Sequence, residues 1–173
     1  MAHDLVHLRD AAANALPCAL DGLDAGRVCV VVVRQEPAFA PAPWVRLEVL
    51  APASRGGTYA VRRSTWRRDV DGERTRAPNV CLDGTPTIDR EARVVASRGW
   101  ARRVAAVAAA AGRCGDPGEV PIRLDATAYH LEIGGPTPQA LAWAHALPRP
   151  WSALRRPLAA LVAAVDTALA AAP

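Results

Sequence analysis

The order of extended and helical segments narrows the possible folds more than any single motif does. Residues 28–33 form a β-branched run typical of a buried central strand, and residues 44–50 alternate apolar and polar side chains. A second alternating region covers residues 122–147. Strands thus come in hairpin-connected runs and do not alternate singly with helices. This order predicts a single α+β domain over residues 1–173, with an antiparallel or mixed sheet and helices packed on one face.

Three segments repeat apolar residues at helical spacing, namely residues 3–16, 97–112 and 154–169. The last has a continuous leucine and valine stripe and predicts an amphipathic C-terminal helix packed on the sheet. Strand hairpins followed by an amphipathic helix occur twice, in residues 28–112 and 122–171. A pseudo-duplicated layout is therefore one interpretation of the domain.

Residues 58–70 form a further extended segment, which Asp71-Gly72 follows directly. An Asp-Gly pair between extended segments is a strong signal for a two-residue hairpin. We therefore expect residues 73–77 to return antiparallel to residues 58–70. Asp69 would then lie opposite Arg74, which is a favourable pair.

This expected hairpin is rich in arginine, which suggests nucleic-acid binding. Arginine clamps phosphates with two hydrogen bonds, and aromatic rings stack on bases. Acidic residues in the same hairpin weaken its positive field, so a solvated sheet face is the competing interpretation. The basic residues are Arg62, Arg63, Arg67, Arg68, Arg74 and Arg76, the aromatic ones Tyr59 and Trp66, and the acidic ones Asp69, Asp71 and Glu73.

The arginine content also has a simpler explanation than function. The chain contains no lysine, so all 21 residues counted as Lys+Arg are arginines, and alanine-rich runs surround them. Both amino acids have G/C-rich codons, and a GC-rich bacterial genome accounts for this usage. The net charge of +4 favours acidic partners only mildly. Arginine richness alone therefore does not indicate a nucleic-acid-binding protein.

Tryptophan is frequent, with five residues against one Phe and two Tyr. Trp66 and Trp151 fall at the edges or outward faces of expected elements. Exposed tryptophan and arginine are typical hot spots of protein interfaces. The alternative is that these tryptophans close the rim of the core. The residues we expect to contact a protein partner are Trp66, Trp151, Arg62, Arg67 and Arg68.

A possible anion site lies where the second helix begins. Ser97 is the expected N-cap, and Arg98 and Arg102 follow one turn apart, with Gly99 between them. Free backbone N–H groups at a helix N-terminus attract phosphates and carboxylates. A plain serine cap beside solvated arginines explains the same residues.

A possible enzyme site involves three residues of the C-terminal strands. His130 and Glu132 share one strand face, and His145 can lie on the neighbouring strand. Such a cluster can bind a metal or transfer protons. No H-E-x-x-H or other catalytic motif supports it. We therefore expect no catalytic residues, no metal and no cofactor, and keep a small His/Glu enzyme as an alternative.

The four cysteines lie far apart and form no C-x-x-C pair, which excludes zinc and thioredoxin-like motifs on spacing. The N-terminus lacks the basic and apolar regions of a secretory signal, and no apolar segment is long enough to cross a bilayer. We therefore expect a reduced cytoplasmic protein that does not bind a membrane.

The C-terminal third arranges a turn, strands and a final helix in a recognisable order. Its features are the Leu124-Asp125 turn, Tyr129-x-Leu131, Gly134-Gly135, Trp143, Pro150-Trp151 and the helix over residues 154–169. This layout resembles that of small bacterial α+β proteins of the immunity or inhibitor kind. The resemblance implies a binding role and transfers no catalytic residue. We therefore expect a non-catalytic protein-interaction module, such as an inhibitor or accessory subunit, with a nucleic-acid-binding accessory protein as the alternative.

Overall fold

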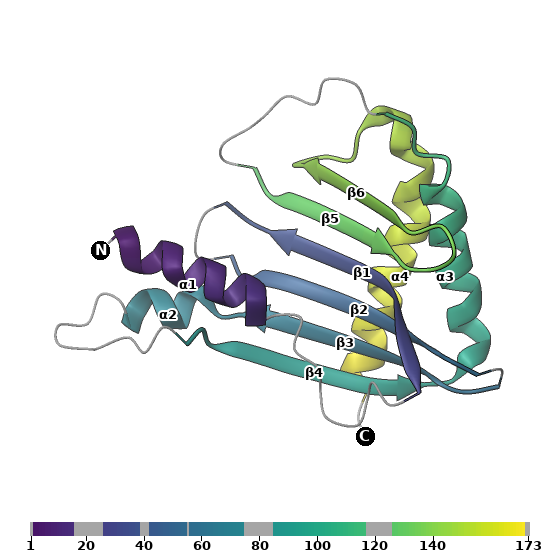
Figure 1. Ribbon diagram of the computed structural model, residues 1–173, viewed down its shortest axis with the longest axis horizontal. Helices are drawn as coiled ribbons and strands as arrows, with labels where there is room; N and C mark the ends of the chain where they lie inside the picture. The colour runs from purple at the N-terminus through teal and green to yellow at the C-terminus, as the bar shows by residue number, and fades with distance from the viewer. Residues whose placement is uncertain are drawn as a thin grey trace.

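The computed structural model describes residues 2–15, 26–38, 42–54, 56–74, 85–116 and 126–171. In chain order the elements are α1 (Ala2–Ala15), β1 (Arg27–Glu36), β2 (Trp44–Pro52), β3 (Tyr59–Trp66), α2 (Arg68–Arg74), β4 (Ile88–Val95), α3 (Ser97–Ala111), β5 (Ala128–Ile133), β6 (Gln139–Ala144), the 3-10 turn η1 (Arg149–Trp151) and α4 (Ser152–Ala170). The strands form one sheet in the order β4-β3-β2-β1-β5-β6, and every neighbouring pair is antiparallel (Figure 1). The predicted α+β class is confirmed.

Helices α3 and α4 lie side by side on one face of the sheet, whereas α1 lies on the opposite face (Figure 1). Side chains of β2 alternate between the two faces of the sheet, so this strand contributes to both of them. Leu47 and Val49 pack in the core beneath α3 and α4, and the intervening Glu48 points to the other face. We call the face opposite α3 and α4 the open face.

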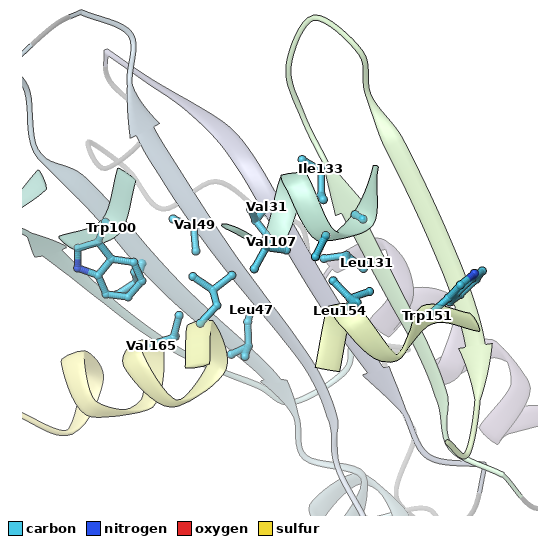
Figure 2. Packing of buried hydrophobic residues seen from close by; sticks show 14 of the residues in the cluster. Val31, Leu47, Val49, Trp100, Val107, Leu131, Ile133, Trp151, Leu154 and Val165 are labelled. Atoms are coloured by element: carbon cyan, nitrogen blue, oxygen red, sulfur yellow. The ribbon is translucent and has the colours of Figure 1, made fainter. Parts of the chain in front are cut away.

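The main core lies between the sheet and the helix pair (Figure 2). Strands β1, β2 and β5 contribute Val31, Leu47 and Leu131, and α4 covers them with Leu154 and other members of its predicted stripe. Further core residues are Val49, Val61, Ile133 and Trp143 from the strands, Trp100 and Val107 from α3, and Leu161 and Val165 from α4. The predicted packing of the C-terminal helix on the sheet is confirmed.

A second, smaller core lies on the open face, where α1 covers one end of the sheet. Leu8 and Ala12 of α1 pack against Trp44 and Trp66, whose rings meet edge to face at 5.2 Å between centroids. Edge-to-face packing is a favoured arrangement of aromatic pairs. The expectation that all helices pack on one face therefore holds for α3 and α4 but not for α1.

The predicted hairpin at Asp71-Gly72 is wrong, because this pair lies inside α2 and residues 68–74 are helical. The Asp71 carboxylate is buried and accepts hydrogen bonds from Trp66 Nε1 (2.7 Å), Thr87 N (2.9 Å) and Thr87 Oγ1 (2.6 Å). A buried carboxylate with several donors is held firmly in place. These contacts fix a helical turn between β3 and β4, so Asp69 and Arg74 do not face each other across two strands.

One smaller expectation also changes, and the pseudo-duplicated layout stays an interpretation. Ser97 is the first residue of α3 and not its cap, because the N-cap position is Ala96 and has no side-chain hydrogen bond. Strand β1 pairs with β5, so the two proposed pseudo-duplicated halves share one sheet. Arg76 and the Leu124-Asp125 turn lie outside the described residues. Within the described part of the chain, no helix is long and apolar enough to span a membrane.

Candidate functional site

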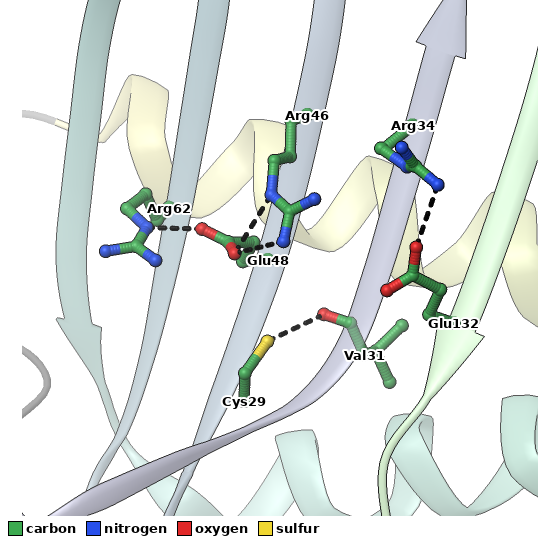
Figure 3. A network of polar contacts seen from close by, with 7 residues as sticks. All are labelled: Cys29, Val31, Arg34, Arg46, Glu48, Arg62 and Glu132. Carbon is green, nitrogen blue, oxygen red and sulfur yellow. Dashed lines mark hydrogen bonds and ion pairs between the residues drawn. The ribbon is translucent and has the colours of Figure 1, made fainter. Parts of the chain in front are cut away.

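The open face carries a buried ionic cluster at its centre, formed by Arg46, Glu48 and Arg62 (Figure 3). Glu48 is 3% exposed and accepts hydrogen bonds from Arg46 Nε (3.0 Å) and Arg46 Nη2 (2.9 Å) through Oε1. Its Oε2 accepts from Nε of the buried Arg62 on the neighbouring strand. A carboxylate that accepts hydrogen bonds from charged donors on both of its oxygens is held firmly in place. Its buried position makes this cluster a structural feature of the sheet.

A second set of charges lies on β1 and β5, closer to solvent. Arg34 donates to Glu132 Oε1 at 2.9 Å, and His130 Nε2 lies 3.9 Å from Glu36 Oε2. His145 follows the end of β6 at a φ of 62°, and its backbone N–H donates to Thr127 O. Among the described residues, no group of three or more His, Cys, Asp or Glu could hold a metal ion. Within this part of the chain, His130, Glu132 and His145 therefore do not form a shared metal site.

Cys29 lies on β1 beside the buried ionic cluster, and its thiol donates to Val31 O at 3.7 Å (Figure 3). Desolvation around the thiol, followed by the negative charge of Glu48, raises its pKa from 9.0 to about 11. The residue itself is exposed, so a reagent can reach it. A reactive thiol requires a depressed pKa, and Cys29 shows the opposite.

We expect Cys29 to react slowly with iodoacetamide. The raised pKa reduces the thiolate about a hundredfold near neutral pH, while the greater nucleophilicity of a more basic thiolate recovers about tenfold of that loss. Alkylation followed by peptide mass spectrometry should give a rate about tenfold lower in the folded than in the unfolded protein. The rate should keep rising with pH up to about 11. A midpoint at or below 9.0 would contradict this assignment.

The residues predicted to contact a partner do not form one exposed surface. Trp66 and Trp151 are each 3% exposed, so the expectation that they face outward is wrong. Trp66 is covered by α1, and Trp151 donates through Nε1 to Gly115 O at 2.7 Å and packs edge to face on Trp143. The interpretation of these tryptophans as residues that close the core is confirmed. A role in partner binding stays a prediction without exposure to support it.

The arginines of the predicted hairpin also do not lie together. Arg62 is buried against Glu48, and Arg67 pairs with Asp69 and Asp89 at 2.9 and 3.2 Å. Hydrogen bonds from Arg67 lower the pKa of Asp69 to about 2. Arg68 lies over the Trp66 ring and donates to Pro37 O at 2.8 Å. Burial lowers the pKa of Arg68, and the nearby Arg9 lowers it further.

The predicted anion site at the start of α3 keeps its arginines close together. Arg98 and Arg102 are exposed and line a hollow of about 510 Å³ with Gly99 and Arg103. Arg103 lies over the Trp100 ring at 5.7 Å from its centroid. Ser97 does not cap the helix, so its side chain gives the site no further definition. Anion binding by Ser97, Arg98 and Arg102 stays a prediction.

The two edge strands of the sheet differ sharply in charge. Strand β4 carries Asp89, Arg90, Glu91 and Arg93 within eight residues, whereas β6 has the sequence QALAWA and no charge. Charged side chains are a usual protection of an edge strand against pairing with another chain. Among the described strands, β6 has a neighbour on one side only. Within the described residues, β6 is therefore the edge strand that lacks charged protection.

The register shows which backbone groups of β6 face outward. His145 N–H donates to Thr127 O one pair beyond the β5–β6 ladder, which runs from Ala128–Ala144 to Ile133–Gln139. Inward-pointing groups recur at every second residue of an antiparallel strand. Trp143 and Leu141 therefore bond to β5, while the N–H and C=O groups of Ala140 and Ala142 point away from it.

The sequence alone does not identify β6 as an edge strand. The absence of charge in residues 139–144 is plain, but a central strand shows the same pattern. Comparison with protein-family models, with curated proteins and with solved structures gave no match for this chain.

Proposed function

We propose that this chain is a non-catalytic protein-interaction module that pairs β6 with an extended segment of a partner protein. The observation that carries the proposal is the uncharged β6 edge with outward backbone groups at Ala140 and Ala142. Strand addition satisfies such groups through main-chain hydrogen bonds. The resemblance of residues 124–169 to immunity and inhibitor proteins supports a role as inhibitor or accessory subunit.

The side chains around this edge favour an incoming strand of alternating character. Ala140 and Ala142 are exposed and small, so they leave room on the open face. On the other face Trp143 is buried in the main core, and the partly buried Leu141 packs against that core. A partner segment with apolar residues at alternate positions would place them beside Leu141 and Trp143.

Ala142→Pro tests the proposal because proline removes one outward N–H and leaves the ladder to β5 intact. Proline is tolerated at such edge positions. We expect partners that copurify with the wild-type protein to be lost from this variant, and retained by Ala142→Val, which keeps the N–H. In a reconstituted complex, hydrogen exchange at the Ala140 and Ala142 amides should slow on partner binding.

Two results would count against the proposal. Full retention of every partner by a folded Ala142→Pro variant would show that β6 is not the docking edge. Concentration-dependent dimerisation that Ala142→Pro abolishes would show that the added strand comes from a second copy of this chain and not from another protein. Sedimentation velocity of the purified proteins separates these cases.

A further inference from the structure

A half-open groove of about 410 Å³ lies between α4 and the part of the sheet formed by β1, β2, β5 and β6. Its floor contains Val33 from β1 and Val45 and Leu47 from β2. Small-molecule sites in proteins span about 300–1,000 Å³ and are mainly apolar. The groove falls within this range in both size and character.

One wall of the groove is rigid and aromatic. The rings of Tyr129 and Trp143 stack at 5.5 Å between centroids with 9° between their planes, and Trp143 is buried. The other wall is α4, which contributes Leu158 and Val162. Pre-formed apolar walls of this kind reduce the ordering that a ligand must impose.

The groove remains open because two small residues of α4 stand at its margin. Ala159 and Ala163 line it one helical turn apart, and both are exposed. A large side chain at either position would occupy the space above Leu47. These alanines therefore offer a way to fill the groove without disturbing the core.

Charged residues at the rim make the two ends of the groove different. Arg155 and Asp166 both line it and are eleven residues apart on α4, about 16 Å along the helix axis. The Asp166 carboxylate is already paired with Arg63 Nη2 at 2.5 Å. Arg155 is exposed and has no acidic partner among the described residues. The elongated groove thus ends in a positive charge that no carboxylate of the described residues pairs with.

We propose that this groove binds a linear amphipathic carboxylate, whose apolar chain lies along α4 and whose head group pairs with Arg155. The shape accounts for a linear ligand, the lining for an apolar chain and Arg155 for an anionic head group. This site uses the side chain of Trp143 and not the outward backbone of β6, on which the proposed partner binding rests.

Calorimetric titration of the full chain with decanoate and with its uncharged analogue decanol tests the assignment. We expect one decanoate per chain and weaker binding of decanol. Arg155→Glu should weaken decanoate binding about five- to tenfold, because a partly exposed attraction is replaced by repulsion. Arg156→Glu, a change at an exposed residue outside the groove lining, should leave the affinity unchanged.

Substitutions that fill the groove provide a second, independent test of the proposal. Ala163→Trp should abolish decanoate binding, while Ala153→Trp at an exposed position outside the groove should not. If Ala163→Trp lowers the melting temperature strongly, Ala159→Leu replaces it. Absence of saturable decanoate binding to the wild-type chain, or unchanged binding in a folded groove-filling variant, would overturn the proposal. Equal binding of decanol and decanoate, unaffected by Arg155→Glu, would overturn the carboxylate assignment.

Discussion

Replacement of Glu48 by alanine should destabilise the domain by about 3–5 kcal/mol, the usual effect of removing one partner from a buried ion pair. Glu48 and Arg62 are 3% and 4% exposed, so neither charge can return to water when the other is lost. The substitution removes the acceptor of Arg62 Nε and of both Arg46 donors. Urea denaturation followed by circular dichroism measures the change in unfolding free energy.

Glu132→Ala is the matched control on the same face. Glu132 is 45% exposed and pairs with Arg34, so its removal should reduce stability by less than about 1 kcal/mol. The double variant Glu48→Leu/Arg62→Leu removes the two fully buried charges but leaves Arg46 without its acceptor, so it should recover part of the stability lost in Glu48→Ala. If Glu48→Ala behaves like Glu132→Ala, the cluster is more hydrated than its burial indicates.

The parts of this fold that sequence predicts correctly depend on local periodicity. Val45, Leu47 and Val49 alternate within one strand, and the leucine and valine stripe of α4 repeats within one helix. Such patterns identify which face of an element is buried without any knowledge of its neighbours. They are sufficient for the α+β class, for the faces of β2 and β5 and for the packing of the C-terminal helix.

The errors arise where contacts distant in sequence override a local signal. Asp71-Gly72 resembles a hairpin turn, but the Asp71 carboxylate is held by Thr87, sixteen residues further along. Trp66 does lie on the face opposite α3 and α4, as its alternation predicts, yet α1 covers that end of the sheet. Sequence periodicity assigns a face but does not show what packs on it.

The candidate surfaces could not be predicted from the sequence for the same reason, namely that they depend on contacts between distant segments. The β6 edge is recognisable only when the strand order is known, because β5 and β6 are adjacent in sequence and β6 is terminal in space. Arg155 has no distinguishing local pattern, and only the structure places it beside the groove under α4. Both proposed sites depend on the spatial order of the strands, which periodicity does not encode.

Leu161→Asp should unfold the domain. Leu161 is 1% exposed on the face of α4 that packs on the sheet. The change loses the burial of a leucine side chain, about 1.5–3 kcal/mol, and places a carboxylate in the core at a further cost of several kcal/mol. The sum is comparable to the whole stability of a typical domain, about 5–15 kcal/mol. A thermal melt should show no cooperative transition.

Graded substitutions on the same helix separate loss of packing from a general effect on α4. Leu161→Ala keeps the helix and leaves a cavity, so it should lower stability by about 2–5 kcal/mol and retain a cooperative melt. Ala160→Asp introduces the same charge at the preceding, exposed residue and should leave the melting temperature nearly unchanged. If the Leu161→Asp variant melts like the Ala160→Asp variant, α4 does not cover the main core. In that case the groove beneath it and the ligand assigned to that groove lose their structural basis.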